Sequence, residues 1–127
     1  MQDKILLVLR IIVAVVLVQT LRFKFTAHPD SVYIFSTIGL EPYGRIVIGI
    51  LELIAAIFIL IPKTIWLGSI LTLGLISGAI LAHLTQLGIE INEDGGTLFY
   101  MALVIFILSF IILLKTRKNI PFIGKNL

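Results

Sequence analysis

The sequence predicts an all-α protein: an antiparallel four-helix transmembrane bundle with a short interfacial helix between its first two membrane helices. The chain has 127 residues, of which 59% are hydrophobic and 13% charged, with a mean hydropathy of +1.15. That apolar content exceeds the usual content of a soluble domain, and little polar surface remains to coat a buried helical hairpin. The apolar residues form blocks close to the roughly 20 residues that a helix needs to cross a bilayer. These blocks are Ile5–Leu21, Ile46–Ile61, Ile65–Leu87 and Leu98–Leu114.

We expect a single membrane domain over residues 1–127. The first apolar block has the basic N-terminal region of a secretory signal, but Arg10 interrupts its apolar core and no small-residue cleavage site follows it. A retained first helix is therefore predicted. The predicted transmembrane helices cover about residues 5–23, 43–61, 65–87 and 98–115, followed by a basic cytoplasmic tail over 116–127.

The link after the first helix is longer and less polar than an ordinary loop. Asp30 or Ser31 is a suitable N-cap, and Val32, Phe35 and Ile38 then recur on one face of a helix. This pattern predicts a short helix over about residues 30–38, lying at the outer membrane surface across the mouth of the bundle.

The remaining links are short. The second and third helices are joined only by "PKT", so they must be antiparallel neighbours. The last link contains "NEDGG", which predicts a turn, and Asp94 or Thr97 is a candidate cap of the fourth helix.

The placement of basic residues predicts the orientation. Lys4, Lys63 and the basic tail belong to one side of the membrane. The other side has Arg22, Lys24 and Arg45, and its last link has no basic residue, so the first side has the excess of basic residues. Both termini are therefore expected in the cytoplasm. A topology signal beside anionic lipid accounts for the basic tail better than nucleic-acid binding does, so no nucleic-acid partner is expected.

Glu52 is the main candidate for a functional residue, because every other residue from Ile46 to Ile61 is apolar or glycine. Intramembrane ionisable groups are usually functional, although a neutral Glu52 that only fixes helix packing is the alternative. Glu52 lies about 10 Å below Arg45, and His83 lies about 6 Å from the same surface, so a Glu52–His83 contact, direct or through water, is possible.

Helical periodicity supports such a contact. Arg45, Gly49 and Glu52 share one face of the second membrane helix, and a face of small or polar residues on the third is expected to meet it. That face consists of Gly68, Thr72, Ala79, His83 and Gln86.

Other polar residues complete the predicted site or border it. Lys24, His28 and Arg45 are expected at its entrance, although Arg45 has an ordinary surface partner in Glu41 four residues earlier. Gln19 is a candidate bundle-facing partner. Arg10, about 8 Å from the inner surface, is expected to extend to lipid head groups, and a contact with Glu52 is left open.

Several chemistries lack their sequence signals. The histidines and Glu52 do not have metal-ligand spacing on one helix, so no metal is expected. A pair of axial haem ligands, a glycine-rich phosphate loop and a nucleophile elbow are also missing. The chain has no cysteine and cannot exchange a disulfide by itself.

The segment from Lys24 to Pro62 with the later "GAILAHL" resembles the DoxX-like family of small four-helix membrane proteins, over about residues 5–115. The resemblance implies a fold more than an activity. Some relatives are described as subunits of membrane oxidoreductases, including thiosulfate:quinone oxidoreductase, and similar animal proteins act as membrane chaperones. More distant relatives perform thiol redox chemistry with cysteine pairs, a role that this chain cannot share because it has no cysteine. The matching positions are Lys24, His28, Pro29, Gly39, Pro42, Arg45, Gly49, Glu52, Leu53, Ala79 and His83.

Three functions follow from the residues and the resemblance together. The first is an accessory subunit of a redox system in the bacterial cell (inner) membrane, which binds a quinone or another small amphiphile while a partner protein carries the redox cofactor. The second is a noncatalytic membrane chaperone or scaffold. The third, a small-solute permease, is disfavoured because four short helices leave little room for a pathway unless the chain forms a homo-oligomer.

Overall fold

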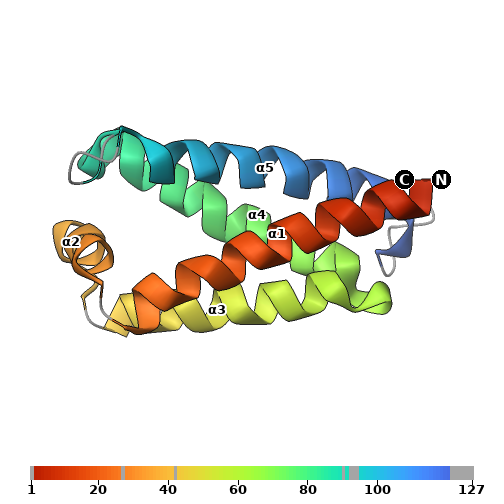
Figure 1. The fold of residues 1–127 in the computed structure, drawn as a ribbon, viewed down its shortest axis with the longest axis horizontal. Coiled ribbons are helices and arrows are strands. Elements are labelled where there is room, and N and C mark those ends of the chain that lie inside the picture. Colours follow the sequence, from red (N-terminus) through yellow and green to blue (C-terminus); the bar gives the residue numbers. More distant parts are fainter. Residues whose placement is uncertain (1, 27, 42, 90, 92–94, 121–127) are drawn as a thin grey trace.

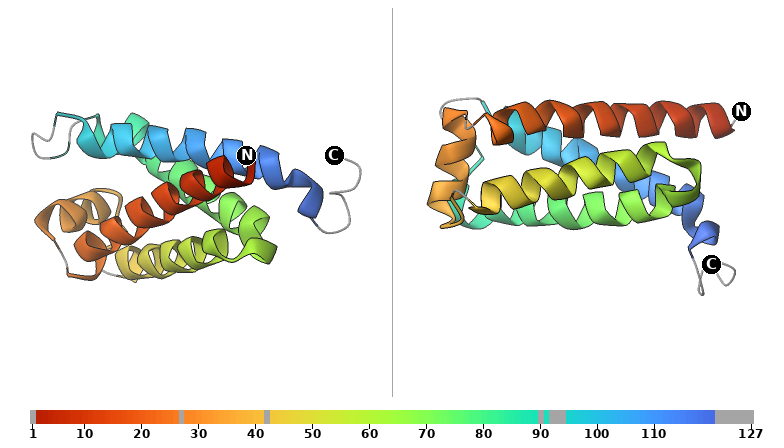
Figure 2. Two further views of the ribbon diagram at one scale, coloured as in Figure 1. Left: turned by 45° about the vertical axis from the view of Figure 1, so that its right-hand side comes forward. Right: turned by 90° about the horizontal axis from the view of Figure 1, so that it is seen from below.

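The computed structural model describes residues 2–26, 28–41, 43–89, 91 and 95–120. Four long helices form an antiparallel bundle, and a short helix, α2, lies across one end of it (Figures 1 and 2). The described residues contain no strand, and the predicted all-α fold is confirmed. The helices are α1 (Gln2–Phe25), α2 (Pro29–Thr37), α3 (Tyr43–Leu60), α4 (Ile65–Ala82) and α5 (Thr97–Thr116), with the short turns η1 (Pro62–Thr64), η2 (His83–Leu87) and η3 (Arg117–Asn119).

The long helices are apolar enough to cross a membrane by length and composition. Their most hydrophobic windows are only between 22% and 33% buried inside the protein. Most of their aliphatic surface therefore faces outward, which a soluble monomer could not tolerate but lipid accommodates. The spans run over Lys4–Phe25, Tyr43–Leu60, Pro62–Leu87 and Thr97–Thr116.

The helices pack in a ring in which α3 contacts α1 and α4, and α5 contacts α4 extensively and α1 less so. The start of α1, the η1 turn and the end of α5 lie at the end of the bundle opposite α2 (Figure 2). From η1, α3 and α4 diverge toward the α2 end (Figure 1). The two helices are therefore closer together at the η1 end than at the α2 end (Figure 1).

The hydrophobic core fills the half away from α2. Val13 and Leu17 of α1 meet Ala55 and Ile59 of α3, and Ile112 of α5 is completely buried with them. In the other half, Phe35 of α2 and Leu87 of η2 are also buried, but they line a cavity. This difference creates the candidate site.

Two helix ends differ from the sequence-based expectation. His28, rather than Asp30 or Ser31, is the N-cap of α2: the Asp30 amide donates to its Nδ1 at 3.1 Å, and Pro29 takes the first helical position. Proline is suited to that position because its missing N–H would have no intrahelical partner. At α5, Gly96 occupies the N-cap position and Thr97 begins the helix, while Asp94 lies outside the described residues.

Candidate ligand-binding cavity

A cavity of about 640 Å³ occupies the α2 half of the bundle. All five helices and η2 contribute to its wall, and most of the lining side chains are aliphatic or aromatic. Ser31 and Phe35 of α2 close one end, and Met101 and Ala102 of α5 form part of the side. The polar groups on the wall include Thr20, Lys24, Glu52 and His83, three of which the sequence had singled out.

Glu52 is 6% exposed, and each of its carboxylate oxygens has a partner on α1. Lys24 Nζ lies 2.9 Å from Oε1, and Thr20 Oγ1 lies 2.8 Å from Oε2. The single hydrogen of the Thr20 hydroxyl is shared between Oε2 and the Leu17 carbonyl oxygen, 2.7 Å away. Thr20 and Lys24 are four residues apart, so they project from the same face of α1. The sequence left open whether Glu52 pairs with His83 or with Arg10. In the structure, Glu52 pairs with Lys24 and Thr20 of α1 instead.

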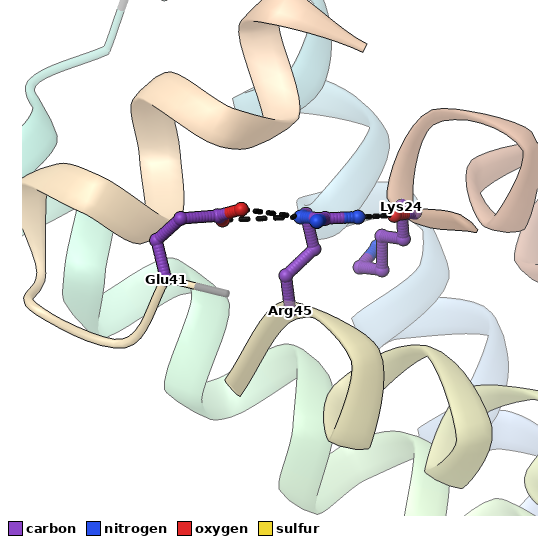
Figure 3. Close-up of polar contacts among 3 residues, drawn as sticks. All are labelled: Lys24, Glu41 and Arg45. Atoms are coloured by element: carbon purple, nitrogen blue, oxygen red, sulfur yellow. Dashed lines mark hydrogen bonds and ion pairs between the residues drawn. The ribbon is translucent and has the colours of Figure 1, made fainter. Parts of the chain in front are cut away.

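Arg45 is buried but does not contact Glu52. Its Nε lies 2.9 and 3.0 Å from the two carboxylate oxygens of Glu41, and its Nη1 donates to the backbone carbonyl of Lys24 (Figure 3). That carbonyl lies in the last turn of α1, where intrahelical partners run out. Arg45 therefore joins the end of α1 to the α2–α3 link and supports the backbone that carries Lys24.

His83 lies on the same cavity wall and is also 6% exposed. Its Nδ1 lies 2.9 Å from the carbonyl oxygen of Gly88, and its ring packs edge-on against Phe99 at 5.4 Å between centroids. No direct hydrogen bond joins it to Glu52 among the described residues, and a contact through water stays a prediction. The two side chains share a cavity instead of a bond.

The expectation that Arg10 extends to lipid head groups is wrong. It is only 8% exposed, and its guanidinium donates to the carbonyls of Ile59 at 2.7 Å and Leu60 at 2.8 Å. These carbonyls end α3, where Pro62 interrupts the helical hydrogen bonding. Unpaired carbonyls in apolar surroundings attract the guanidinium inward more strongly than lipid head groups draw it outward.

Gln19 is exposed and lies outside the cavity, so it is not the bundle-facing partner that was expected. Its neighbour Thr20 has that role. His28 stays near the α2 end, half-buried, with its ring edge-on to Phe23 at 4.6 Å. Sequence reasoning missed Thr20, whose only signal is its spacing of four residues from Lys24.

The small and polar face predicted on the third membrane helix divides into two parts. Gly68 and Thr72 are buried against neighbouring helices, whereas Ala79 faces the cavity and Gln86 is exposed. A Cβ at Gly68 would lie 2.6 Å from the backbone nitrogen of Ile59, so α3 and α4 touch there. Gly68 thus meets Ala55 and Ile59 of α3, whereas the predicted α3 face of Arg45, Gly49 and Glu52 lies against α1. The expectation that the two predicted faces meet is therefore wrong.

These features define a multi-pass membrane protein whose bundle holds an apolar cavity with a few enclosed polar groups. Across the described residues, no three His, Cys, Asp or Glu side chains are grouped as a metal site would require. The chain belongs to the DoxX-like family, whose family model matches residues 8–112. No curated protein and no solved structure matches it significantly.

Proposed function

We propose that this protein is an accessory membrane subunit that binds a small amphiphile, such as a quinone, on behalf of a redox system. The cavity is the observation that carries the proposal. Its volume of about 640 Å³ lies within the roughly 300–1,000 Å³ of typical small-molecule sites. An apolar wall with few polar groups suits a ligand that has a ring or chain and one polar head.

The polar groups favour a head group that accepts hydrogen bonds. Lys24 Nζ has three hydrogens, and the pairing with Glu52 Oε1 uses one direction. A carbonyl oxygen on the ligand can accept another, while Glu52 keeps the ammonium in place. Lys24 and Glu52 thus supply binding and orientation, and electron transfer is assigned to a partner protein because this chain has no cysteine or other redox-active motif.

The distribution of basic residues supports a location of the cavity in the outer half of the membrane. Lys4, Lys63, Lys115, Arg117 and Lys118 belong to the end of the bundle opposite α2. The positive-inside rule then assigns that end, with both termini, to the cytoplasm of a bacterial cell, and the cavity to the outer half of the inner membrane. A lipid-soluble ligand would reach the cavity from the outer leaflet.

Binding of a short-chain quinone to the protein in nanodiscs tests the proposal, with empty nanodiscs correcting for partition into lipid. Lys24→Met should weaken binding about tenfold, as loss of a charged hydrogen bond predicts, whereas Lys63→Met at the opposite end should leave it unchanged. Ala82→Phe fills part of the cavity, keeps both Lys24 and Glu52, and should also weaken binding. Absence of saturable binding, or equal affinities in all variants, would overturn the proposal.

Purification in native lipid, followed by mass spectrometry, tests the redox association. A flavin-, haem- or sulfur-handling protein, or bound quinone, should accompany the wild type. Partners that remain after Glu52→Gln, together with no ligand in the wild type, would instead indicate a scaffold.

A further inference from the structure

His83 and Gly88 are joined by a reciprocal pair of hydrogen bonds. The Gly88 amide donates to the His83 carbonyl at 2.8 Å, and His83 Nδ1 lies 2.9 Å from the Gly88 carbonyl oxygen. A carbonyl oxygen can only accept, so Nδ1 carries the hydrogen in this contact. In a neutral imidazole the other nitrogen, Nε2, is then an acceptor with a free lone pair.

The local backbone enforces this arrangement. His83 begins a π-helical turn, a rare geometry that is frequent at functional sites. Gly88 ends the turn with φ = +79°, a conformation that a side chain disfavours, and this turns its carbonyl back toward the imidazole. The edge-on contact with Phe99 restricts the ring further. The fold therefore fixes both the orientation and the tautomer of His83.

The lone pair of Nε2 has no partner among the described residues. Their only fully enclosed side-chain polar atom without a hydrogen bond is Ser109 Oγ, so Nε2 retains accessible surface. His83 is almost entirely buried in the protein and lines the cavity, which makes the cavity the space open to it. Glu52 is another acceptor on the cavity wall, with Lys24 and Thr20 as its partners, and replacement of His83 alone separates the two acceptors.

We propose that His83 Nε2 is the acceptor for a hydrogen-bond donor on the ligand, and that the cavity selects amphiphiles with a hydroxyaryl head: a phenol or the hydroquinone form of a quinone. This inference rests on the proposed ligand-binding function and narrows its ligand class. A quinone presents only acceptors to the protein, whereas its reduced form presents hydroxyl groups that donate. The cavity would therefore hold the reduced form more tightly.

A pair of redox-inert probes tests the donor requirement: 4-hexylphenol and 4-hexylanisole, which differ by replacement of the hydroxyl hydrogen with a methyl group. Titrated into protein in nanodiscs and corrected with empty nanodiscs, the phenol should bind about three- to tenfold more tightly, as one neutral hydrogen bond predicts. His83→Phe should remove this preference while keeping apolar binding. Gly88→Ala should reduce it by loosening the ring, and Gln86→Leu, at an exposed position of the same turn, should not change it.

The outcomes separate this inference from the function on which it rests. If both probes bind the wild type equally, the donor requirement is wrong and the cavity function stands; if neither binds, both fail. If His83→Phe does not fold, the ring nitrogens of ¹⁵N-histidine wild type give the answer, with His28 as internal reference. The His83 Nε2 resonance should move with the phenol and not with the anisole, and an unmoved resonance during saturable binding would overturn the inference.

Discussion

Glu52 is tolerated in the membrane because the bundle supplies partners for both of its oxygens. Its position seven residues after Arg45 places it deep enough to lose most hydration, and an unpaired carboxylate there would be costly. Lys24 and Thr20, which lie on one face of α1, offset that cost because they pair with the two carboxylate oxygens. The same contacts tie α1 to α3 beside the cavity, so the proposed binding group also contributes to the packing of the bundle.

This pairing predicts strong coupling between Glu52 and Lys24. Each single change, Glu52→Leu or Lys24→Leu, should destabilise the protein by up to about 3–5 kcal/mol, because it leaves the other charge buried alone. The double change should cost clearly less than the sum of the two. Reversible unfolding of the four proteins in detergent or bicelles gives the coupling energy. Strict additivity would show that the ion pair contributes nothing to the fold.

The matched control is the cycle of Glu52→Leu with His83→Leu. The two side chains share no direct hydrogen bond among the described residues, although both line the cavity, so their coupling energy should be clearly smaller than that of the Glu52–Lys24 cycle. Coupling as large as that of the lysine cycle would contradict the separate roles given to Glu52 and His83.

Individual residues of the site were predictable where they broke the apolar pattern. Glu52 and His83 stand out from their surroundings, and both line the cavity. Thr20 does not, because threonine is common in membrane helices, where its hydroxyl can bond to a carbonyl of its own helix. Gln19 drew attention because it lies on the opposite face of α1 from Arg10, which was expected to face lipid. Arg10 is buried instead, so the opposite face of α1 points outward and Gln19 is exposed. The partner of Glu52 could not be predicted, because it depends on the path of α1 beside α3. Neither the depth of a residue in the membrane nor the helical periodicity of α3 and α4 gives that path.

Arg10 leads to a second prediction at the residue scale. Arg10→Leu should destabilise the protein by about 1.5–3 kcal/mol, because two carbonyls at the end of α3 lose a charged donor in apolar surroundings. Arg22→Leu is the control, since Arg22 is exposed in the last turn of the same helix, and its effect should stay within about 0.5 kcal/mol. The free energies of unfolding of the two variants test this prediction. Equal effects of Arg10→Leu and Arg22→Leu would indicate that Arg10 faces lipid.

At the scale of elements, the crossing of α3 and α4 sets the size of the cavity. The helices touch at Gly68, where a Cβ would meet the Ile59 nitrogen at 2.6 Å and the Ala55 carbonyl oxygen at 2.9 Å. Because these are backbone atoms, no side-chain rotation relieves the clash. Close contact near η1 leaves room for the helices to spread at the α2 end (Figure 1).

A third prediction compares two glycines of α4. Gly68→Ala should push the helices apart and destabilise the bundle by about 1–3 kcal/mol, as overpacking usually does. Gly74→Ala meets open space and should be neutral or stabilising by up to about 1 kcal/mol, through higher helix propensity. Unfolding measurements on both variants test the pair. A destabilisation at Gly74 equal to that at Gly68 would refute the close contact as the cause.

The elements themselves were more predictable than their ends. Apolar blocks of membrane-spanning length identified the four long helices, and the periodicity of Phe35 and Ile38 identified α2, because both signals are local. The π turn at His83–Leu87 was predicted as ordinary helix, since one extra residue in a turn leaves no mark on hydrophobicity. The cap by His28 was missed because aspartate and serine are the commoner caps.

At the scale of the whole molecule, packing and charge follow the same axis. The half with the start of α1 and the end of α5 holds the dense core and ends in lysines and arginines, and the half covered by α2 holds the cavity. Sequence reasoning anticipated this polarity from charge alone. It could not anticipate the cavity, because an empty volume results from the divergence of helices and not from any particular residue.

The last prediction concerns the orientation of this axis in the membrane. The chain has no cysteine, so single cysteines can be introduced without a background. Tyr43, which is 80% exposed, and the exposed Thr37 lie at the α2 end, whereas the exposed Lys63 and Lys118 lie at the other. A membrane-impermeant maleimide added to intact spheroplasts should label cysteines at Thr37 and Tyr43, and those at Lys63 and Lys118 only after lysis. Labelling at Lys63 and Lys118 alone would show that the bundle has the opposite orientation, with the cavity in the cytoplasmic half. Labelling at both ends in intact spheroplasts would contradict a single membrane-spanning orientation.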